Sequence, residues 1–168
     1  MARIKVDTRS ASSLAYKLSF LNDWEVTRIG KQAVYAGAGF ATDRLRSAID
    51  RLRRVPDVDA INAWWHNQPT FICVSQKNGL RESLGIATFR VRLNVIETKV
   101  GFTGYNSVRT RKYPNGQPNR MIAATCNHGT AGYMIRQPFI TVTAEVFGTE
   151  IRKKMRDKTN DELKKALN

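Results

Sequence analysis

Two cysteines and two histidines are the residues of this chain that could do metal or nucleophilic chemistry. Cys126 and His128 are separated by a single residue, and thiolate and imidazole are both zinc ligands. A structural zinc site needs four ligands in closely spaced pairs, and neither His66 nor Cys73 supplies the second pair. A cysteine nucleophile needs a histidine in reach and a third group to orient it, and no such motif flanks either cysteine. We therefore expect no metal, no cofactor and no catalytic residue, and a hydrolase that uses Cys126 and His128 is the alternative to test.

Acidic pairs and a glycine pair are the other patterns with a chemical interpretation. The acids at 57 and 59 and at 161 and 162 lie where helices are expected to stop and start, so we interpret them as caps. Gly37 and Gly39 resemble part of a nucleotide-binding fingerprint, but they lie inside a helical pattern, lack a third glycine and follow no strand. Neither pattern predicts catalysis or phosphate binding.

The chain is strongly basic, with 28 lysines and arginines against 14 acidic residues and a formal charge of +14. Such a surface attracts polyanions or acidic proteins. Much of this charge lies where helices are expected to end, and cations there interact favourably with the helix dipole. Residues 101–138 differ, because they contain five cations and no acid. The five are Arg109, Arg111, Lys112, Arg120 and Arg136.

Residues 103–120 are rich in Gly, Asn, Pro and Arg and show no sustained period, so we expect a long loop. A structureless loop longer than about 12–15 residues in a compact domain is usually functional or disordered. Tyr105 and Tyr113 could stack on bases, but no RNA-recognition or helix-turn-helix signature surrounds them. We expect an acidic protein in preference to nucleic acid as the partner of this loop. The candidate contact residues are Arg109, Arg111, Lys112, Tyr113 and Arg120.

Helical elements are expected at both ends of the sequence. From Trp24 onward apolar residues recur at steps of three and four, which predicts a long helix over 24–54. Gly37 and Gly39 should each cost about 1 kcal/mol there relative to Ala, so a kink or a close helix contact is expected. Helical spacing returns from Phe139 to Lys158, and a capping box at 159–162 predicts a separate short helix to the C-terminus.

Strands are expected in the middle. Residues 71–74 predict a short strand, and 78–84 predict a glycine turn followed by alternating apolar and polar residues. Residues 89–102 predict a half-buried antiparallel strand pair, with Phe89, Val91, Leu93 and Val95 on its apolar face. Residues 121–125 predict one more strand.

Length and composition are those of one globular domain, and the helices and strands expected above make its fold class α+β. A domain of 168 residues can bury roughly 70% of its unfolded surface without staples. We expect an N-terminal arm or short helix at 1–23, a single domain at 24–158 and a short helix at 159–168. The start has no apolar run of signal-peptide type, two cysteines make no disulfide framework, and no run approaches the roughly 18 apolar residues of a membrane span. A reducing cytoplasm and no membrane are therefore expected.

Three stretches in this order resemble the small tail-completion or head–tail joining (neck) proteins of long-tailed bacteriophages. The first is the long basic helix. The second is 78–84 (Asn-Gly-Leu-Arg-Glu-Ser-Leu), similar to the family's Thr-Gly-x-Leu-x-x-Ser-Ile element, which leads into its first strands. The third is 127–130 followed by 137–140, similar to the family's Glu-x-Gly-Thr and Arg-Pro-Phe-Leu elements. Order and spacing match over 25–158, with Asn78, Asn127 and Gln137 in place of the family's Thr, Glu and Arg or Lys.

The resemblance implies a structural role. It implies a long N-terminal helix packed on a curved antiparallel sheet, followed by a C-terminal helical region. It also implies a virion subunit, made in the bacterial cytoplasm, that forms a ring (expected to be a hexamer), completes the tail and joins it to the head around the DNA channel. The tail terminator, connector and tail proteins would be its partners. The motif residues would be scaffold: Gly79, Leu80, Ser83, Gly129, Thr130, Pro138 and Phe139. A basic nucleic-acid-binding module is the alternative.

Overall fold

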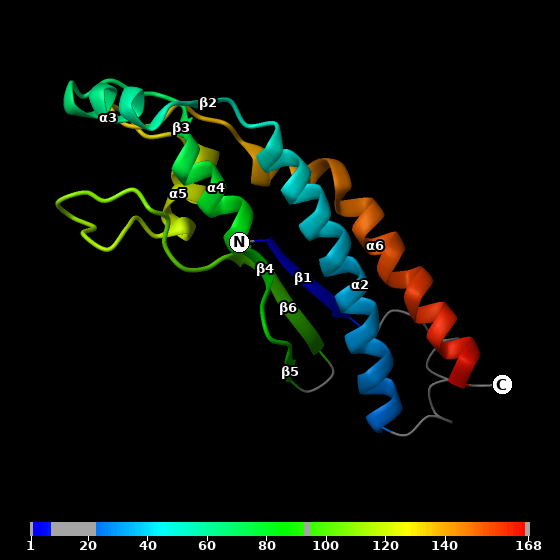
Figure 1. The fold of residues 1–168 in the computed structure, drawn as a ribbon. Coiled ribbons are helices and arrows are strands. Elements are labelled where there is room, and N and C mark those ends of the chain that lie inside the picture. The colour runs from blue at the N-terminus through cyan, green and yellow to red at the C-terminus, as the bar shows by residue number, and fades with distance from the viewer. Residues whose placement is uncertain (1, 8–22, 93–94, 167–168) are drawn as a thin grey trace. The chain divides into compact units, whose positions relative to one another are not determined.

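The fold is α+β, as predicted, with a long N-terminal helix, an antiparallel sheet and a C-terminal helix (Figure 1). The computed structural model describes residues 2–7, 23–92 and 95–166, and most of the predicted N-terminal arm or short helix lies outside these. Of that segment, Ala2–Asp7 is described and forms strand β1, and Asp23 is the first residue of α2. The other elements are α2 (Asp23–Asp50), β2 (Arg54–Val55), α3 (Asp57–Trp65), β3 (Ile72–Cys73), α4 (Val74–Ser83), β4 (Leu84–Ile86), β5 (Arg90–Arg92), β6 (Val95–Phe102), α5 (Asn119–His128) and α6 (Phe139–Ala166).

The chain divides into two compact units that interleave along the sequence. Unit 1 draws on residues within 1–41, 86–100 and 147–168, and unit 2 on 42–85 and 101–146. The single domain expected at 24–158 stays a prediction. No helix among the described residues is long and apolar enough to cross a membrane.

In unit 1, α2 and α6 run antiparallel and pack on β6. Val34, Ile96 and Met155 form a buried cluster, with Phe89 and Ile151 packed against it. The predicted long helix is confirmed, and it ends at Asp50. The close contact expected at its glycines is present at Gly37, because a Cβ there would run into the Met155 side chain of α6.

The sheet is arranged around β6. β1 pairs antiparallel with β6 from Ala2 opposite Val100 to Asp7 opposite Val95, and β5 pairs antiparallel with β6. β4 also pairs with β6. The predicted strand pair at 89–102 is therefore confirmed. Its predicted apolar face is only partly buried, because Val91 stays 45% exposed; Leu93 lies outside the described residues.

Unit 2 corrects two predictions. The glycine turn expected at 78–84 is wrong, because Gly79 and Leu80 are buried in the interior of helix α4. The strand expected at 121–125 is also wrong, because these residues lie in α5, whose buried residues include Ile122, Ala123 and Cys126. That spacing is helical, but five residues are too few to distinguish it from a strand by pattern. The strand expected at 71–74 is confirmed as β3, which pairs parallel with β2.

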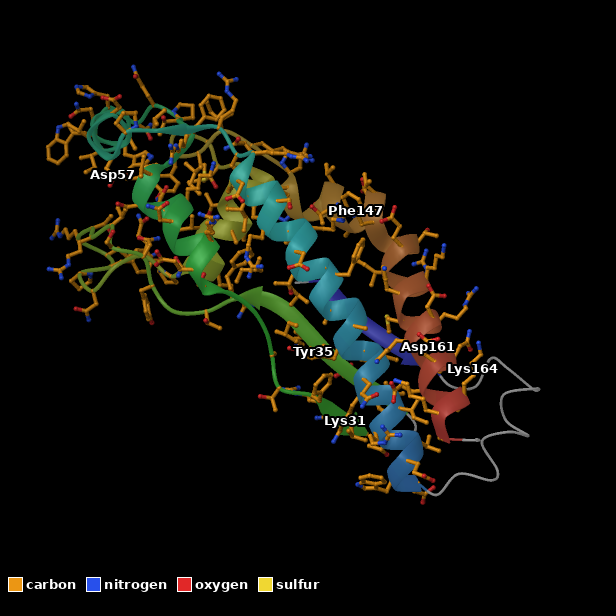
Figure 2. All side chains as sticks on the ribbon, turned by 45° about the vertical axis from the view of Figure 1, so that its right-hand side comes forward. Lys31, Tyr35, Asp57, Phe147, Asp161 and Lys164 are labelled. Atoms are coloured by element: carbon orange, nitrogen blue, oxygen red, sulfur yellow. The ribbon has the colours of Figure 1, made fainter. Side chains whose placement is uncertain are left out.

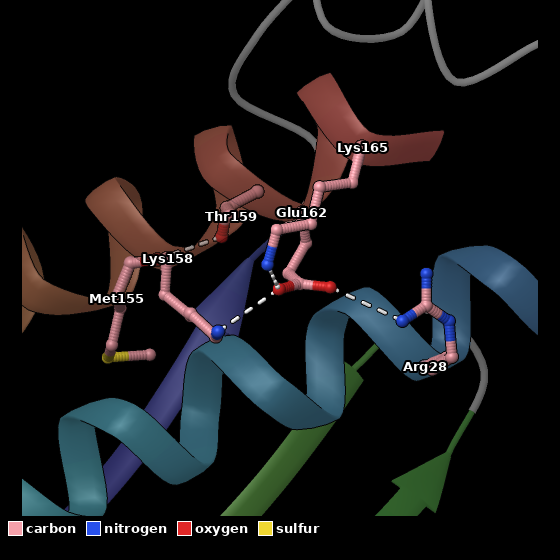
Figure 3. A network of polar contacts seen from close by, with 6 residues as sticks. All are labelled: Arg28, Met155, Lys158, Thr159, Glu162 and Lys165. Atoms are coloured by element: carbon pink, nitrogen blue, oxygen red, sulfur yellow. Dashed lines mark hydrogen bonds and ion pairs between the residues drawn. The ribbon is translucent and has the colours of Figure 1, made fainter. Parts of the chain in front are cut away.

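The C-terminus corrects a third prediction. Residues 139–166 form one helix, so the separate short helix at 159–168 is wrong. The capping box is not used, because the Thr159 hydroxyl donates to the Met155 carbonyl within the helix at 2.9 Å. Glu162 is buried and binds Arg28 of α2 at 3.3 Å, Lys158 at 3.0 Å and Lys165 at 2.9 Å (Figure 3). This acid joins two helices instead of starting one.

Candidate functional site: a pinned cationic loop

The loop predicted at 103–120 is present between β6 and α5, and its base is closed by hydrogen bonds. We call residues 103–118 the cationic loop. The Asn106 amide donates to the Gln117 carbonyl, and the Gln117 amide donates to the Val108 carbonyl, both at 3.0 Å. The Asn106 side chain accepts the Val108 amide at 2.9 Å. These bonds give the loop a defined path. The sequence, which has no sustained period here, predicted a loop but not its path.

Buried side chains fix this base to the rest of unit 2. Val108 is 8% exposed and packs with Ala60 of α3 and Cys73. The side-chain amide of Gln76, in α4, donates to the side-chain oxygen of Gln117 at 2.7 Å. Both glutamine amides also donate to the Tyr133 hydroxyl at 3.0 Å. Buried polar groups satisfied in this way specify one arrangement, so they hold the loop in place.

The tip of the loop is a tight turn that presents cations. The amide of Thr110 donates to the carbonyl of Tyr113 at 3.1 Å, and the reverse bond is 3.0 Å, so Arg111 and Lys112 occupy the two central positions. Arg109, Arg111 and Lys112 are exposed, and none of the three forms an ion pair within the described part of the chain. The Lys112 ammonium lies 5.6 Å from the centroid of the half-buried Tyr113 ring. Arg120, the fifth candidate, is exposed in the first turn of α5, beyond the loop.

The glycines of the family-like motifs occupy positions that need glycine. Gly79 lies where α4 approaches the loop base, and a Cβ there would be 2.6 Å from the Asn106 Cβ and 2.7 Å from the Asn119 Oδ1. Gly129 follows α5 with φ of +78°, a left-handed conformation that favours glycine. Gly79 thus lies inside a helix and not in the turn that its sequence predicted, and Gly129 lies at the end of α5.

The other motif residues lie in or next to the core of unit 2. Leu80 is fully buried, and Phe139 packs edge-on against Phe102 with ring centroids 6.1 Å apart. Thr130 forms an isolated bridge with Met134, and Pro138 immediately precedes α6. The Ser83 hydroxyl is buried and has no hydrogen-bond partner within the described residues.

Two residues that depart from the family pattern also hold this region together. The Asn127 side-chain oxygen accepts the amides of Ile140 and Thr141 at 2.9 and 3.1 Å, so it caps the start of α6 from α5. The Gln137 side chain accepts the Arg53 amide at 2.8 Å and donates to the Arg53 carbonyl at 3.1 Å. These hydrogen bonds join residues that are distant in sequence, so no local signal could have revealed them.

Helix α3 carries an exposed apolar face that the sequence did not single out. Val58, Ile61 and Trp65 are 61%, 52% and 87% exposed and recur at helical spacing. The neighbouring Trp64 faces the other way, where it stacks on Tyr133 at 4.8 Å and donates its indole N–H to the Tyr133 carbonyl at 3.0 Å. We call Val58, Ile61 and Trp65 the α3 apolar face.

Of the two acids in the first turn of α3, Asp57 has a structural role and Asp59 is exposed. Asp57, at the start of α3 (Figure 2), accepts hydrogen bonds from the backbone and the hydroxyl of Ser75, in the first turn of α4. Burial raises the pKa of Asp57, but the Ser75 hydrogen bonds outweigh it and leave the pKa below its ordinary value. Asp57 was expected to cap a helix end; it instead binds a backbone amide in the first turn of α4, whose N-cap residue is Cys73.

The cysteines are poor nucleophiles in this fold. Burial raises the pKa of both Cys73 and Cys126 to about 12, so neither thiol carries appreciable thiolate near neutral pH. The Cys126 sulfur lies 3.9 Å from the Gln137 amide nitrogen, and His128 contacts the Asn127 side chain. Within the residues that the structure describes, no group of three or more His, Cys, Asp or Glu side chains could hold a metal ion.

Comparisons of the chain with protein-family models, with curated proteins and with solved structures find no match.

Proposed function

We propose that this chain is a structural subunit of a tailed-phage neck. In this role it completes the tail and joins it to the head as one member of a ring around the DNA channel. The resemblance at 78–84, 127–130 and 137–140 supports the proposal, and so does the α+β architecture that the resemblance implies. The motif residues described above act as turns, caps and core anchors, which is the chemistry of a scaffold.

The observation that carries the proposal is the α3 apolar face. An exposed cluster of large apolar side chains on one helix face marks a contact with another protein more often than a free surface. Trp65 is the centre of this face at 87% exposure, and tryptophan is enriched among the residues that dominate binding energy. A subunit that works inside an assembly has such a face.

A binding experiment with phage tails tests this function. The purified chain is mixed with tail tubes and tail terminator and examined by electron microscopy and co-sedimentation. We expect added density at the head-proximal end of the tail, and we expect Trp65→Ser to abolish it while the circular dichroism spectrum stays unchanged. Trp24→Ser is the matched control, because Trp24 is also exposed, at 70%, but lies on α2. A protein that never associates with tails and terminator contradicts the proposed function.

Nucleic-acid binding is the second candidate, and the exposed cations of the loop tip favour it. If the loop binds a phosphate backbone, the logarithm of affinity falls linearly with the logarithm of salt concentration, by about 0.9 per phosphate contacted on duplex DNA. The triple variant Arg109→Ala, Arg111→Ala, Lys112→Ala should then flatten that slope. A salt-independent response in the unmodified protein excludes this function.

A further inference from the structure

The first turns of α6 carry a second exposed surface. Its side chains are apolar and acidic, whereas the tip of the cationic loop is basic. Val142 and Val146 are 48% and 60% exposed, and the exposed Glu145 lies between them in sequence. Phe139 and Thr143, on the other side of the same turns, are buried. Glu145 forms no ion pair with any described residue. We call Val142, Glu145 and Val146 the α6 stripe.

The tip of the cationic loop is complementary to this stripe in charge, and its long side chains can also cover the apolar part of the stripe. It offers three cations that form no ion pair with any described residue. Arginine and lysine can lay their methylene stems over apolar side chains while their charged ends reach a carboxylate. The hydrogen bonds at the loop base and the turn at 110–113 already fix its path. Little conformational entropy is therefore lost when the loop is bound, which favours association.

We propose that the tip of the cationic loop in one copy of this chain docks on the α6 stripe of the next copy. The loop and the stripe are different surfaces, so the contact is head-to-tail, and a head-to-tail contact forms a ring when its rotation closes. The proposal rests on the proposed function for the expectation that the contact closes into a ring. The contact itself rests on the charges and exposures of the two surfaces.

A charge-swap experiment tests the contact. One variant carries Arg111→Glu and Lys112→Glu, and a second carries Glu145→Lys. Sedimentation velocity at low salt is expected to show self-association of the unmodified chain, and dissociation constants raised about tenfold or more in each variant alone. Mixing the two variants should restore association, because the acidic tip then meets Lys at position 145 and the basic tip of the second variant meets the unmodified Glu145.

A matched control separates this contact from a general effect of net charge. Lys153→Glu with Lys154→Glu makes the same change of charge on exposed residues of α6 outside the stripe. It should leave self-association within about twofold of the unmodified chain, because it keeps both the basic tip and Glu145. A control that loses self-association as strongly as the Arg111→Glu, Lys112→Glu variant overturns the proposal, as does a mixture of the two charge-swap variants that fails to associate.

The remaining outcomes separate the contact from the proposed function. An unmodified chain that stays monomeric at low salt overturns the contact, whereas its binding to tails decides the function independently. A different outcome is a chain that shows the association pattern expected of the charge-swap variants and yet fails to bind tails. That result supports the contact between copies and contradicts the neck function. If Arg111→Glu with Lys112→Glu abolishes binding to duplex DNA and leaves self-association intact, the loop contacts nucleic acid and the contact between copies is overturned.

Discussion

Replacement of Gly79 by alanine separates helix propensity from packing at the point where α4 meets the cationic loop. Gly79 is in a helix interior, so alanine alone should stabilise it by about 0.5–1 kcal/mol. The added methyl group, however, would lie 2.6 Å from the Asn106 Cβ, 2.7 Å from the Asn119 Oδ1 and 3.3 Å from the Asn106 Cα. Because Asn106 is fixed by its backbone bond to Gln117, it cannot simply rotate away.

The change in the free energy of unfolding is the balance between the gain in helix propensity and the cost of overpacking. Overpacking a filled interior costs typically about 1–3 kcal/mol, which exceeds the gain in helix propensity. We expect Gly79→Ala to lower the free energy of unfolding by about 1 kcal/mol, and the melting temperature by about 2–4 °C for a chain of this length. Urea and thermal unfolding followed by circular dichroism measure both quantities.

Gly39→Ala is the matched control. Gly39 is also inside a helix, but a Cβ there has no atom of the described residues within 4 Å apart from its own helix backbone, so only the propensity gain remains. We expect this variant to be more stable than the unmodified protein by about 0.5–1 kcal/mol. Gly79→Ala should also speed tryptic cleavage at the loop cations, whereas Gly39→Ala should not. A Gly79→Ala protein as stable as the Gly39→Ala protein would refute the reasoning.

Three further predictions concern other parts of the fold. The hydrogen bonds from Lys165 and Lys158 hold the pKa of Glu162 at about 2, below its ordinary 4.5, so this acid contributes stability that is present above pH 4.5 and is lost as the pH falls towards 2. Glu162→Gln should therefore lower the melting temperature at pH 7 and flatten its decline below pH 4.5; equal melting curves at pH 7 would contradict this. Tyr133→Phe removes the acceptor of two buried glutamine amides, which should cost about 1–3 kcal/mol in urea unfolding and accelerate tryptic cleavage of the cationic loop. With their pKa at about 12, Cys73 and Cys126 should resist alkylation at pH 8 in the native protein and react rapidly in denaturant, and rapid labelling of the native state would show that burial has been misjudged.

The sequence alone determined the features that depend on local periodicity. Apolar residues at three- and four-residue steps predicted α2, and alternation predicted the strand pair at 89–102, because each pattern places one face towards the core. The excess of Gly, Asn and Pro predicted the loop after β6, and its bias in charge predicted a cationic contact surface there. These signals lie within a few residues of one another, so no knowledge of the fold was required.

The tertiary structure decided the features in which distant segments compete with a local signal. Asn78-Gly79 is a turn signal, yet residues 74–83 are helical because Leu80 is buried in the core and a glycine is required against Asn106. Thr159 and Glu162 form a capping box in sequence, yet Arg28 of α2 binds Glu162 and the helix continues. The cationic loop owes its defined path to glutamines and a tyrosine from three separate segments. Such groups meet only after folding, because buried polar atoms need partners that local sequence does not supply.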